Sequence, residues 1–367
     1  MRIMFAGGGT GGHIYPALSV IRKLREKDPK VAILFIGSDR GLEKRLMKES
    51  KIDFIPIKVQ GLRRSFSWRN FQAIGKFLKT IPEAKKIIKK FKPDIVVGTG
   101  GYVSAPILYE ASRLTIKTLI FEPNSYPGLA NRILAKKVDC VAISDQNSAQ
   151  FFPSKKIAFT GNPRSQEVYE SSLNSVEISK GNIKLPQVLI FGGSLGALKI
   201  NEATEQMIQS YKIKNFNLIF ATGRRYYDAK KNFFEKLQKK ENVTIKPYID
   251  HMLDLLPQIS LMICRSGATT IAELTALGVP AILIPSPNVT HDHQTYNATT
   301  LSNLNAAILL PEDQLSAAKL YKLINELISD SKKLSIMKKN AFKLGQRHAT
   351  DHFIEVLKKL INEDSRK

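Results

Sequence analysis

The chain has 367 residues, of which 43% are hydrophobic and 24% charged, a composition typical of a globular protein rather than a disordered or collagen-like one. Its length is sufficient for two domains of ordinary size. Its 56 Lys and Arg residues outnumber its 32 Asp and Glu residues by 24. This positive surplus predicts an anionic partner: nucleic acid, an acidic membrane surface or a phosphorylated substrate.

Cysteine content and hydropathy indicate in which cellular compartment the protein is located. Cys140 and Cys264 are too few for a disulfide scaffold or a Cys-rich zinc module, and they suit a reducing compartment. No apolar run approaches the roughly 20 residues that span a bilayer. The start, Met1–Ala6, runs into a glycine loop and does not resemble a signal peptide. We therefore expect a cytosolic protein.

Short apolar runs alternate with longer amphipathic stretches, which predicts the α/β class with parallel sheets covered on both faces. The expected helices include Pro16–Lys27 and Leu42–Glu49. The expected strands are Arg2–Ala6, Val31–Ile36, Ile95–Val97, Thr118–Phe121, Val138–Ile143, Val188–Phe191, Leu218–Ala221, Val243–Ile245, Leu261–Cys264 and Ala281–Ile284.

The alternation breaks near Asn162-Pro163-Arg164 and restarts at Val188. We therefore predict two Rossmann-like domains, residues 1–163 and residues 164–340. The tail from about 341 to 367 has a helical pattern, and we expect it to pack back on the first domain. Because ligands of open parallel sheets bind beyond the carboxyl ends of the strands, two facing sheets would form one deep cleft between the domains.

Small-residue loops follow several predicted strands. Gly7–Gly12 fits the G-x-G-x-x-G spacing of dinucleotide sites, and Asp39 follows the next strand as a possible ribose ligand. Glycines let a backbone approach an anion, and the helix N-terminus offers N–H donors. Similar loops are Gly98–Tyr102, Gly192–Ala197 and Arg265–Thr270. Tight turns without a ligand are the alternative, but the number of these loops favours phosphate-rich ligands.

Polar residues near these loops are candidates for chemistry. His13 follows the first glycine loop, where a helix N-terminus disfavours the imidazolium and leaves a ring that can accept a proton. Ser194 could donate to a phosphate, and Glu273 could bind both ribose hydroxyls. Gln294 and Asn297 are amides suited to sugar hydroxyls. Each of these residues also has an explanation without a ligand. His13 could cap or pack against its helix, Glu273 could be an ordinary acid of an amphipathic helix, and the two amides could be surface loop residues. The histidines lack the spacing of a metal site, so no metal is predicted.

Leu62–Lys92 is the densest basic segment. It contains one acid, Glu83, and apolar residues at near-helical spacing, among them Phe66, Trp68 and Phe71. This pattern is typical of a helix attracted to anionic lipids, or of a helix packed on a sheet with a lysine-rich exposed side. The basic residues are Arg63, Arg64, Arg69, Lys76, Lys79, Lys85, Lys86, Lys89, Lys90 and Lys92.

Six motifs in register resemble glycosyltransferase family 28. They are Gly7–Ala17, Gly98–Ser104, Glu122–Asn124, Gly161–Arg164, Gly192–Ala197 and Cys264–Gly267 with Glu273. The resemblance implies a GT-B fold and an inverting transfer without metal or other cofactor. The implied donor is UDP-GlcNAc. The implied acceptor is the C4 hydroxyl of undecaprenyl-pyrophosphoryl-N-acetylmuramoyl-pentapeptide (lipid I) in peptidoglycan synthesis. It also implies peripheral attachment to anionic lipids on the cytoplasmic side of the inner membrane.

The same resemblance implies roles for individual residues. His13 would be the general base, Ile249 would present its backbone to uracil and Glu273 would bind the ribose. Gln294 would bind GlcNAc hydroxyls, although His293-Gln294-Thr295 differs from members with two glutamines. The remaining ligands would be Thr10, Gly11 and Gly12 for the sugar and the acceptor diphosphate, Asn124 for the donor sugar, and Arg164 and Ser194 for the donor diphosphate.

Three alternatives remain at this stage. A related transferase could glycosylate another lipid, such as diacylglycerol. An NAD-dependent enzyme would use the first fingerprint, but the second glycine loop and Arg265-Ser266-Gly267 disfavour it. A non-enzymatic basic protein could bind membranes or nucleic acid. The sequence has no zinc-finger, RNA-binding or helix-turn-helix signature, so nucleic acid is not a predicted partner.

Overall fold

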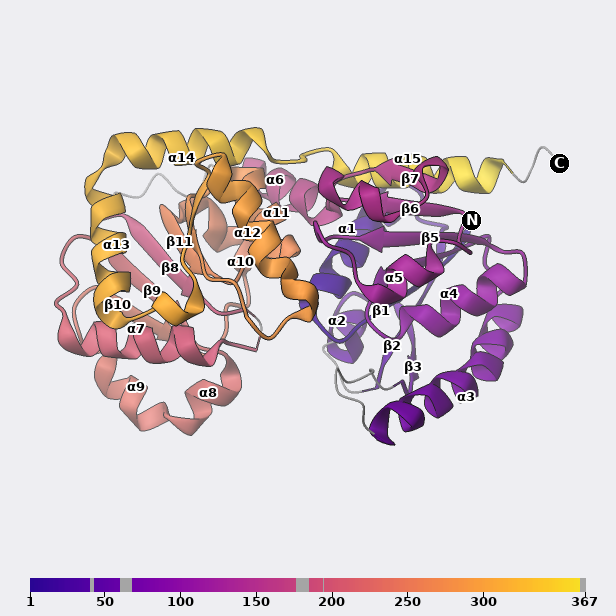
Figure 1. The fold of residues 1–367 in the computed structure, drawn as a ribbon, viewed down its shortest axis with the longest axis horizontal. Helices are drawn as coiled ribbons and strands as arrows, with labels where there is room; N and C mark the ends of the chain where they lie inside the picture. Colours follow the sequence, from indigo (N-terminus) through magenta and orange to yellow (C-terminus); the bar gives the residue numbers. More distant parts are fainter. Residues whose placement is uncertain (40–42, 60–67, 176–184, 194, 364–367) are drawn as a thin grey trace. The chain divides into compact units, whose positions relative to one another are not determined.

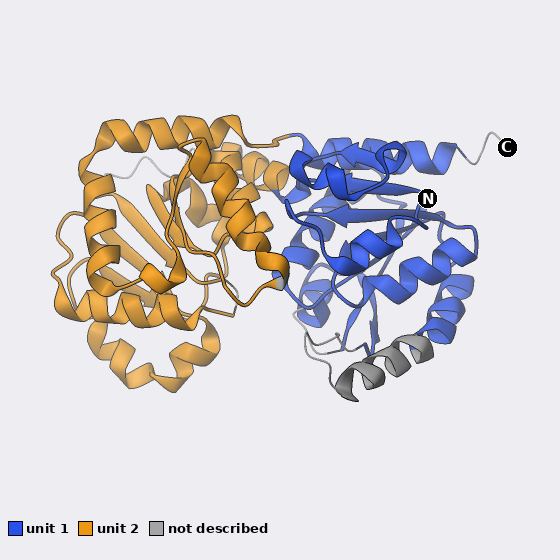
Figure 2. Cartoon of the chain, in the orientation of Figure 1, with its two compact units in different colours: residues 1–164, 348–367 blue, residues 165–347 orange. Residues whose placement is uncertain are grey.

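The computed structural model describes residues 1–39, 43–59, 68–175, 185–193 and 195–363, and only the backbone of residues 68–79, 174, 175 and 290. The chain divides into two compact units (Figure 2). Unit 1 contains residues 1–164 and 348–367, and unit 2 contains residues 165–347. Each unit is built around its own parallel sheet.

The described part of unit 1 forms a seven-stranded sheet in the order β3-β2-β1-β4-β5-β6-β7 (Figure 1). All its neighbouring strands pair in parallel. The direction of strand order reverses between β1 and β4, which is the switch point where such sheets bind ligands. The strands are β1 (Arg2–Gly7), β2 (Ala32–Ser38), β3 (Asp53–Ile57), β4 (Ile95–Gly100), β5 (Lys117–Glu122), β6 (Cys140–Ile143) and β7 (Ile157–Phe159).

Helices cover both faces of this sheet. They are α1 (Gly11–Lys27), α2 (Glu43–Glu49), α3 (Trp68–Phe91), α4 (Ser104–Arg113), α5 (Leu129–Leu134), the 3-10 turns η1 (Gln146–Phe151) and η2 (Ser154–Lys156), the start of α6 (Pro163–Ser175), and α15 (Ala349–Asn362). Successive residues of β1 face opposite sides, as the two-residue strand period requires. Ile3 and Phe5 pack with α1 and α15, whereas Met4 and Ala6 pack with α3 and α4.

The described part of unit 2 forms a six-stranded parallel sheet in the order β10-β9-β8-β11-β12-β13. Its switch point lies between β8 and β11. The strands are β8 (Gln187–Phe191), β9 (Asn217–Ala221), β10 (Val243–Lys246), β11 (Leu261–Cys264), β12 (Ala281–Leu283) and β13 (Ala307–Leu309).

Unit 2 is also covered by helices on both faces. They are α7 (Leu198–Ser210), α8 (Arg224–Ala229), α9 (Lys231–Leu237), α10 (Met252–Leu255), η3 (Leu256–Gln258), α11 (Ala268–Leu277), η4 (Thr290–Asp292), α12 (His293–Asn303), η5 (Glu312–Gln314), α13 (Ala317–Ser329) and α14 (Ser331–Lys343). Val188 and Ile190 pack with α7 and α13, and Leu189 packs with α11 and α12. The two faces of β8 are thus both buried, which explains its continuous apolar sequence.

The structure confirms the predicted α/β class with two parallel sheets, and a strand lies at each predicted position. The sequence analysis missed β3, β7 and β13. Two of these are edge strands with only three residues each, and the edge strand β3 contains Pro56 among partly exposed residues. In β3 and β7 the apolar residues are interrupted or too few to stand out, whereas β13 lies in the apolar run Ala306–Leu310, which the sequence analysis overlooked.

Two helix starts were predicted wrongly. Helix α1 begins at Gly11 and has Pro16 inside it, so it starts five residues before the expected position. The last helix begins at Ala349 and not near residue 341, because α14 continues to Lys343. The chain then makes a close turn at Gly345, where a Cβ would collide with the carbonyl of Thr275.

The described helices include none that is both long enough and apolar enough to cross a membrane. Helix α15 packs instead against α1 and β5 through Phe353, Ile354 and Leu357. The ring of Phe353 meets Phe121 edge to face, with centroids 5.9 Å apart. The Thr350 hydroxyl also donates a hydrogen bond to the carbonyl of Pro163 at 2.8 Å.

We predict that Phe353→Ala lowers the free energy of unfolding of unit 1 by about 3–5 kcal/mol, because it leaves a cavity against β5. Native-state hydrogen exchange should show faster exchange of the β1 and β5 amides, with β8 and β11 unchanged. The exposed Lys358 on the same helix offers the control, since Lys358→Ala should change stability by less than about 0.5 kcal/mol. Unchanged protection of β5 in Phe353→Ala would contradict this packing role.

Candidate functional site

The two glycine loops of unit 1 meet at the switch point of its sheet. The first follows β1 and the second follows the neighbouring strand β4. The Gly8 N–H donates to the carbonyl of Gly100 at 3.3 Å, and a Cβ at position 101 would collide with the carbonyl of Gly8. The loops are therefore in direct backbone contact, which only glycine at these positions allows.

His13 lies in the first turn of α1, beside both loops. Its Nδ1 is 3.0 Å from the carbonyl oxygen of Gly8 and 3.5 Å from the Thr10 hydroxyl. A carbonyl oxygen only accepts, so the shorter contact requires a proton on Nδ1 and places the lone pair of the neutral ring on Nε2. The ring also lies against Gly100, where a Cβ would be 2.6 Å from the His13 Cδ2. The contacts fix the ring and its tautomer.

The other predicted residues of this loop differ in exposure. Thr10 precedes α1 and is exposed, Gly11 is buried and Gly12 is half-buried. The N-terminal turn of α1 contains no acidic residue. The partial positive charge of this helix end is therefore unopposed within its own first turn, which favours an anionic ligand.

The loop after β5 is organised by the buried carboxylate of Glu122. One oxygen accepts from the backbone and side-chain amides of Asn124, at 3.0 and 3.1 Å. The other accepts from the Gly128 N–H at 3.1 Å and from the Asn131 side chain at 2.9 Å. Burial is the largest influence and raises the pKa of the Glu122 carboxyl, and the four hydrogen bonds oppose it. Glu122 thus sets the position of Asn124.

Arg164 lies near the start of α6 and is buried, with 5% of its surface exposed. Its guanidinium stands 5.0 Å from the centroid of the Tyr15 ring, a cation–π distance. Its backbone N–H donates to the Asn162 side chain at 3.1 Å, which explains why the turn needs this asparagine. A buried cation therefore lies on unit 1 close to the first turns of α1.

Unit 2 repeats the arrangement at its own switch point, where the loops after β8 and β11 are neighbours. In the loop after β8, a Cβ at position 196 would collide with the Thr222 carbonyl, so this glycine packs on the end of β9. Ser194, predicted in this loop as a phosphate ligand, lies outside the described residues. So do Arg63, Arg64 and Phe66 of the basic segment.

The predicted uridine ligands lie on two further segments of unit 2. Ile249 follows β10, and its side chain is buried in the core with 7% exposure, so the fold anchors this loop through that side chain. Glu273 lies on α11 with 8% exposure. Burial, assisted by the Glu273 carboxylate, raises the pKa of the Cys264 thiol. Glu273 therefore lies near Cys264, at the carboxyl end of β11.

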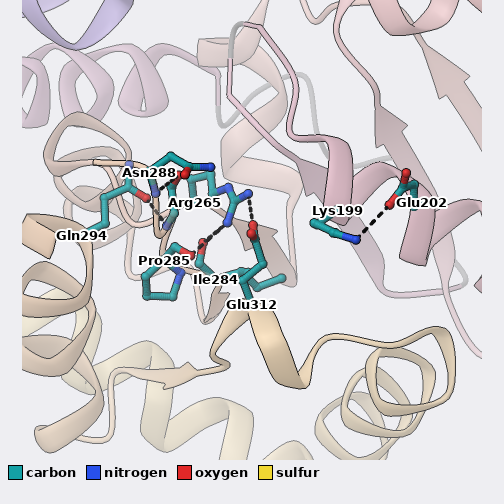
Figure 3. Close-up of polar contacts among 9 residues, drawn as sticks. Lys199, Glu202, Arg265, Ile284, Pro285, Asn288, Gln294 and Glu312 are labelled. Carbon is teal, nitrogen blue, oxygen red and sulfur yellow. Dashed lines mark hydrogen bonds and ion pairs between the residues drawn. The ribbon is translucent and has the colours of Figure 1, made fainter. Parts of the chain in front are cut away.

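Arg265 is a structural clamp beside Gln294, as Figure 3 shows. Its guanidinium donates to the carbonyls of Ile284 and Pro285, at 3.2 and 2.9 Å, and forms an ion pair with Glu312. The Gln294 side-chain oxygen accepts from the Ser286 N–H at 2.9 Å. That contact fixes the plane of the side-chain amide and therefore also the direction in which its NH₂ group can donate.

Sequence reasoning missed two features of the site. It included Glu122 and Arg265 in motifs without recognising that they hold Asn124 and the segment after β12. It did not single out Glu43, a fully buried acid that contacts the first glycine loop. Glu43 is the first residue of α2 and is followed by Lys44 and Arg45, so no sequence pattern marks it as buried. Among the described residues, no group of three or more His, Cys, Asp and Glu side chains could hold a metal ion.

Both units match models of known protein families. A family model described as the glycosyltransferase family 28 N-terminal domain matches residues 3–143, and one described as the family 28 C-terminal domain matches residues 187–353. A protein of Oenococcus oeni is 47% identical over 99% of this chain and 98% of its own length. A protein of Lactococcus lactis subsp. cremoris is 42% identical over 99% of this chain and 100% of its own length. Both are named UDP-N-acetylglucosamine--N-acetylmuramyl-(pentapeptide) pyrophosphoryl-undecaprenol N-acetylglucosamine transferase.

Solved structures agree with the fold. The crystal structure of Acinetobacter baumannii MurG matches with a TM-score of 0.73 and 28% identity, over 98% of this chain and 99% of that one. UDP-GlcNAc 2-epimerase from Neisseria meningitidis matches with a TM-score of 0.68 over 98% of this chain and 100% of that one. At 15% identity, the epimerase supports the two-sheet architecture alone.

We predict that Glu122→Gln lowers the free energy of unfolding by about 2–4 kcal/mol. All four partners of this carboxyl are donors, two on each oxygen, so a glutamine NH₂ must face two of them in either orientation. Urea denaturation measures the effect. Glu83→Gln on the exposed side of α3 is the control and should change stability by less than about 0.5 kcal/mol. Equal stability of the two variants would contradict the assigned donors.

Proposed function

This chain belongs to glycosyltransferase family 28, and from that premise we propose that it transfers GlcNAc from UDP-GlcNAc to the C4 hydroxyl of lipid I, giving lipid II for peptidoglycan. The observation that carries the proposal is His13, held with the lone pair of its neutral ring on Nε2 at the N-terminus of α1. A dinucleotide fold has no need of an oriented base at this point, whereas transfer to a hydroxyl does.

The proposed reaction is a single displacement with inversion. His13 Nε2 takes the proton from the acceptor C4 hydroxyl as its oxygen attacks C1 of GlcNAc. The bond between C1 and the diphosphate oxygen breaks, and UDP leaves with the electron pair. Backbone N–H groups of the glycine loops and the guanidinium of Arg164 would stabilise the charge that develops on the diphosphate.

We assign donor recognition mainly to unit 2. Ile249 would offer its backbone to uracil, Glu273 would bind the ribose hydroxyls, and Gln294 would bind hydroxyls of GlcNAc, with Ser194 at the diphosphate. The fixed amide plane of Gln294 supports this assignment, since a preset donor loses less conformational freedom on binding. Arg265, which already donates to two carbonyls and Glu312, would support the site and not the ligand.

We assign acceptor recognition to unit 1. Thr10, Gly11 and Gly12 would bind the acceptor diphosphate at the first turn of α1, and Asn124 would reach the donor sugar from the loop that Glu122 holds. Arg164 lies on this unit and would contact the diphosphate of UDP from there. No metal is required by this scheme, because the backbone donors and one arginine supply the positive charge.

Transfer of radiolabelled GlcNAc to lipid I tests the proposed function. Release of UDP from UDP-GlcNAc should depend on added lipid I, and the labelled product should carry one GlcNAc on N-acetylmuramic acid. Diacylglycerol in place of lipid I should give no UDP release. Transfer to diacylglycerol, or no transfer to lipid I, would contradict the assigned acceptor.

We predict that His13→Ala lowers kcat by about 10²–10⁴-fold, the usual contribution of a general base. The KM for UDP-GlcNAc should change less than about threefold, because its proposed ligands lie mainly on unit 2. The exposed His251 provides the control, and His251→Ala should keep wild-type kinetics. Near-normal turnover of His13→Ala in steady-state assays would remove His13 from the base role.

We further propose that the protein attaches peripherally to anionic lipids on the cytoplasmic side of the inner membrane, where its acceptor is anchored. Helix α3 supports this proposal, because its described C-terminal half has two different faces. Ala84 and Ile88 are buried against the sheet, whereas the lysines are exposed. Exposed lysines attract anionic head groups at about 1 kcal/mol each near the surface. The exposed lysines are Lys85, Lys86, Lys89, Lys90 and Lys92.

We predict that the triple change Lys85→Glu, Lys86→Glu and Lys89→Glu weakens binding to phosphatidylglycerol vesicles at least tenfold, with a smaller effect at high salt. Vesicle co-sedimentation measures the binding. Three exposed lysines of unit 2 provide a control of equal charge: Lys231→Glu, Lys236→Glu and Lys239→Glu. Equal loss in both triples would mean that net charge, and not α3, determines the binding.

A further inference from the structure

The peptide group between Gly8 and Gly9 is hydrogen-bonded at both ends. Its carbonyl, the oxygen of Gly8, accepts from Nδ1 of His13 at 3.0 Å. Its N–H, the amide of Gly9, donates to Oε1 of Glu43 at 2.7 Å. A continuous path therefore runs from the Glu43 carboxylate through one peptide plane to the imidazole that we propose as the base.

Glu43 is the first residue of α2 and is fully buried, with 0% of its surface exposed. Its Oε1 also accepts from the Ser38 hydroxyl at 3.2 Å. Its Oε2 is buried and has no hydrogen-bond partner in the described parts of unit 1. A buried carboxyl with one unsatisfied oxygen costs stability, and an apolar side chain would avoid that cost. Its presence therefore calls for a role beyond packing.

Neighbouring glycines confine this peptide group. A Cβ at position 8 would collide with Oε1 of Glu43, and a Cβ at position 37 would lie 3.1 Å from the Cβ of Glu43. On the other side, a Cβ at position 101 would collide with the Gly8 carbonyl. The peptide is thus enclosed between the Glu43 side chain and the second glycine loop, and its plane has little freedom to turn.

We propose that Glu43 is a positioning residue for His13 and acts through the Gly8–Gly9 peptide. Because a peptide group is planar, a hydrogen bond that fixes its N–H also fixes the direction of its carbonyl. Accepting from the N–H also polarises the peptide and makes its carbonyl a stronger acceptor for the Nδ1 proton. Glu43 thereby keeps the His13 lone pair on Nε2 without touching the ring.

A competing contact of His13 Nδ1 is the Thr10 hydroxyl at 3.5 Å. That hydroxyl could donate to Nδ1 in the opposite tautomer, which would move the ring proton to Nε2 and leave no base there. At 3.5 Å this contact is the weaker of the two. A carbonyl held by Glu43 decides between the tautomers in favour of the reactive one.

The tautomer of His13 in the wild-type protein tests the inference without any assay of activity. Nitrogen-15 NMR of the full chain, at a pH where the ring is neutral, should show a protonated Nδ1 and an unprotonated Nε2. The inference rests on His13 as the proposed base, but the two can fail separately. Lack of GlcNAc transfer by the wild type would refute the proposed function, whereas GlcNAc transfer by a wild type with the ring proton on Nε2 would refute the positioning role of Glu43 alone.

Two conservative variants of Glu43 distinguish the effect of its side-chain length from the effect of its charge. Glu43→Asp keeps the carboxylate but withdraws it by roughly 1.5 Å, one carbon–carbon bond. We expect it to populate both ring tautomers and to lose kcat about tenfold or more, with the KM for UDP-GlcNAc unchanged within about threefold. Glu43→Gln loses the charge but keeps an oxygen at the same reach, so it should retain the wild-type tautomer and most of the wild-type kcat.

Glu49 at the other end of α2 supplies the control. Its side chain is 61% exposed and lies 3.7 Å from Arg45, so Glu49→Asp and Glu49→Gln should match the wild type. Wild-type kcat and tautomer in Glu43→Asp would overturn the proposal. Loss of kcat in Glu43→Gln with retention in Glu43→Asp would overturn it too, because the charge and not the hydrogen bond would then matter.

Discussion

Close backbone contact between neighbouring loops is the constraint on which the unit 1 site depends. Parallel strands β1 and β4 end side by side, and their glycine loops touch through the Gly8 N–H and the Gly100 carbonyl. A side chain at position 100 would occupy the place of the His13 ring, and one at position 101 would displace the Gly8 carbonyl. The glycines therefore do more than allow an anion to approach: they create the space in which an imidazole is held.

Unit 2 shows that the same strand order can serve a different purpose. Its two loops also end on neighbouring strands, and Gly196 packs against the end of β9. The cation of its second loop, Arg265, is however bound to two carbonyls and to Glu312, so it fixes the segment that presents Gln294. The loops of one sheet thus fix an imidazole, and the loops of the other fix a side-chain amide.

The sequence predicted the fold well where burial is symmetric and poorly where it is not. β1, β4 and β8 are buried on both faces, and their apolar runs identify them without a structure. Edge strands such as β3 have mixed exposure, which a sequence pattern does not separate from a loop. In the site, loop spacing revealed His13 because it is local. Glu43 escaped because its contact joins residues 34 positions apart, and such contacts leave no periodic trace.

The distribution of charge inside and outside the protein explains how a strongly basic chain can use acids at its site. Among residues whose exposure is described, five acids are buried but only one base, Arg164: the acids are Glu43, Glu110, Glu122, Glu205 and Glu273. Burying carboxylates leaves an even larger positive surplus at the surface, and a positive surface potential favours the approach of anions. Inside, a carboxylate can accept several N–H donors at once, as Glu122 does, and so it fixes loops whose glycines have no side chains to hold them. Flexible glycine loops and buried acids therefore belong together: the first permit close approach, and the second restore the rigidity that catalysis needs.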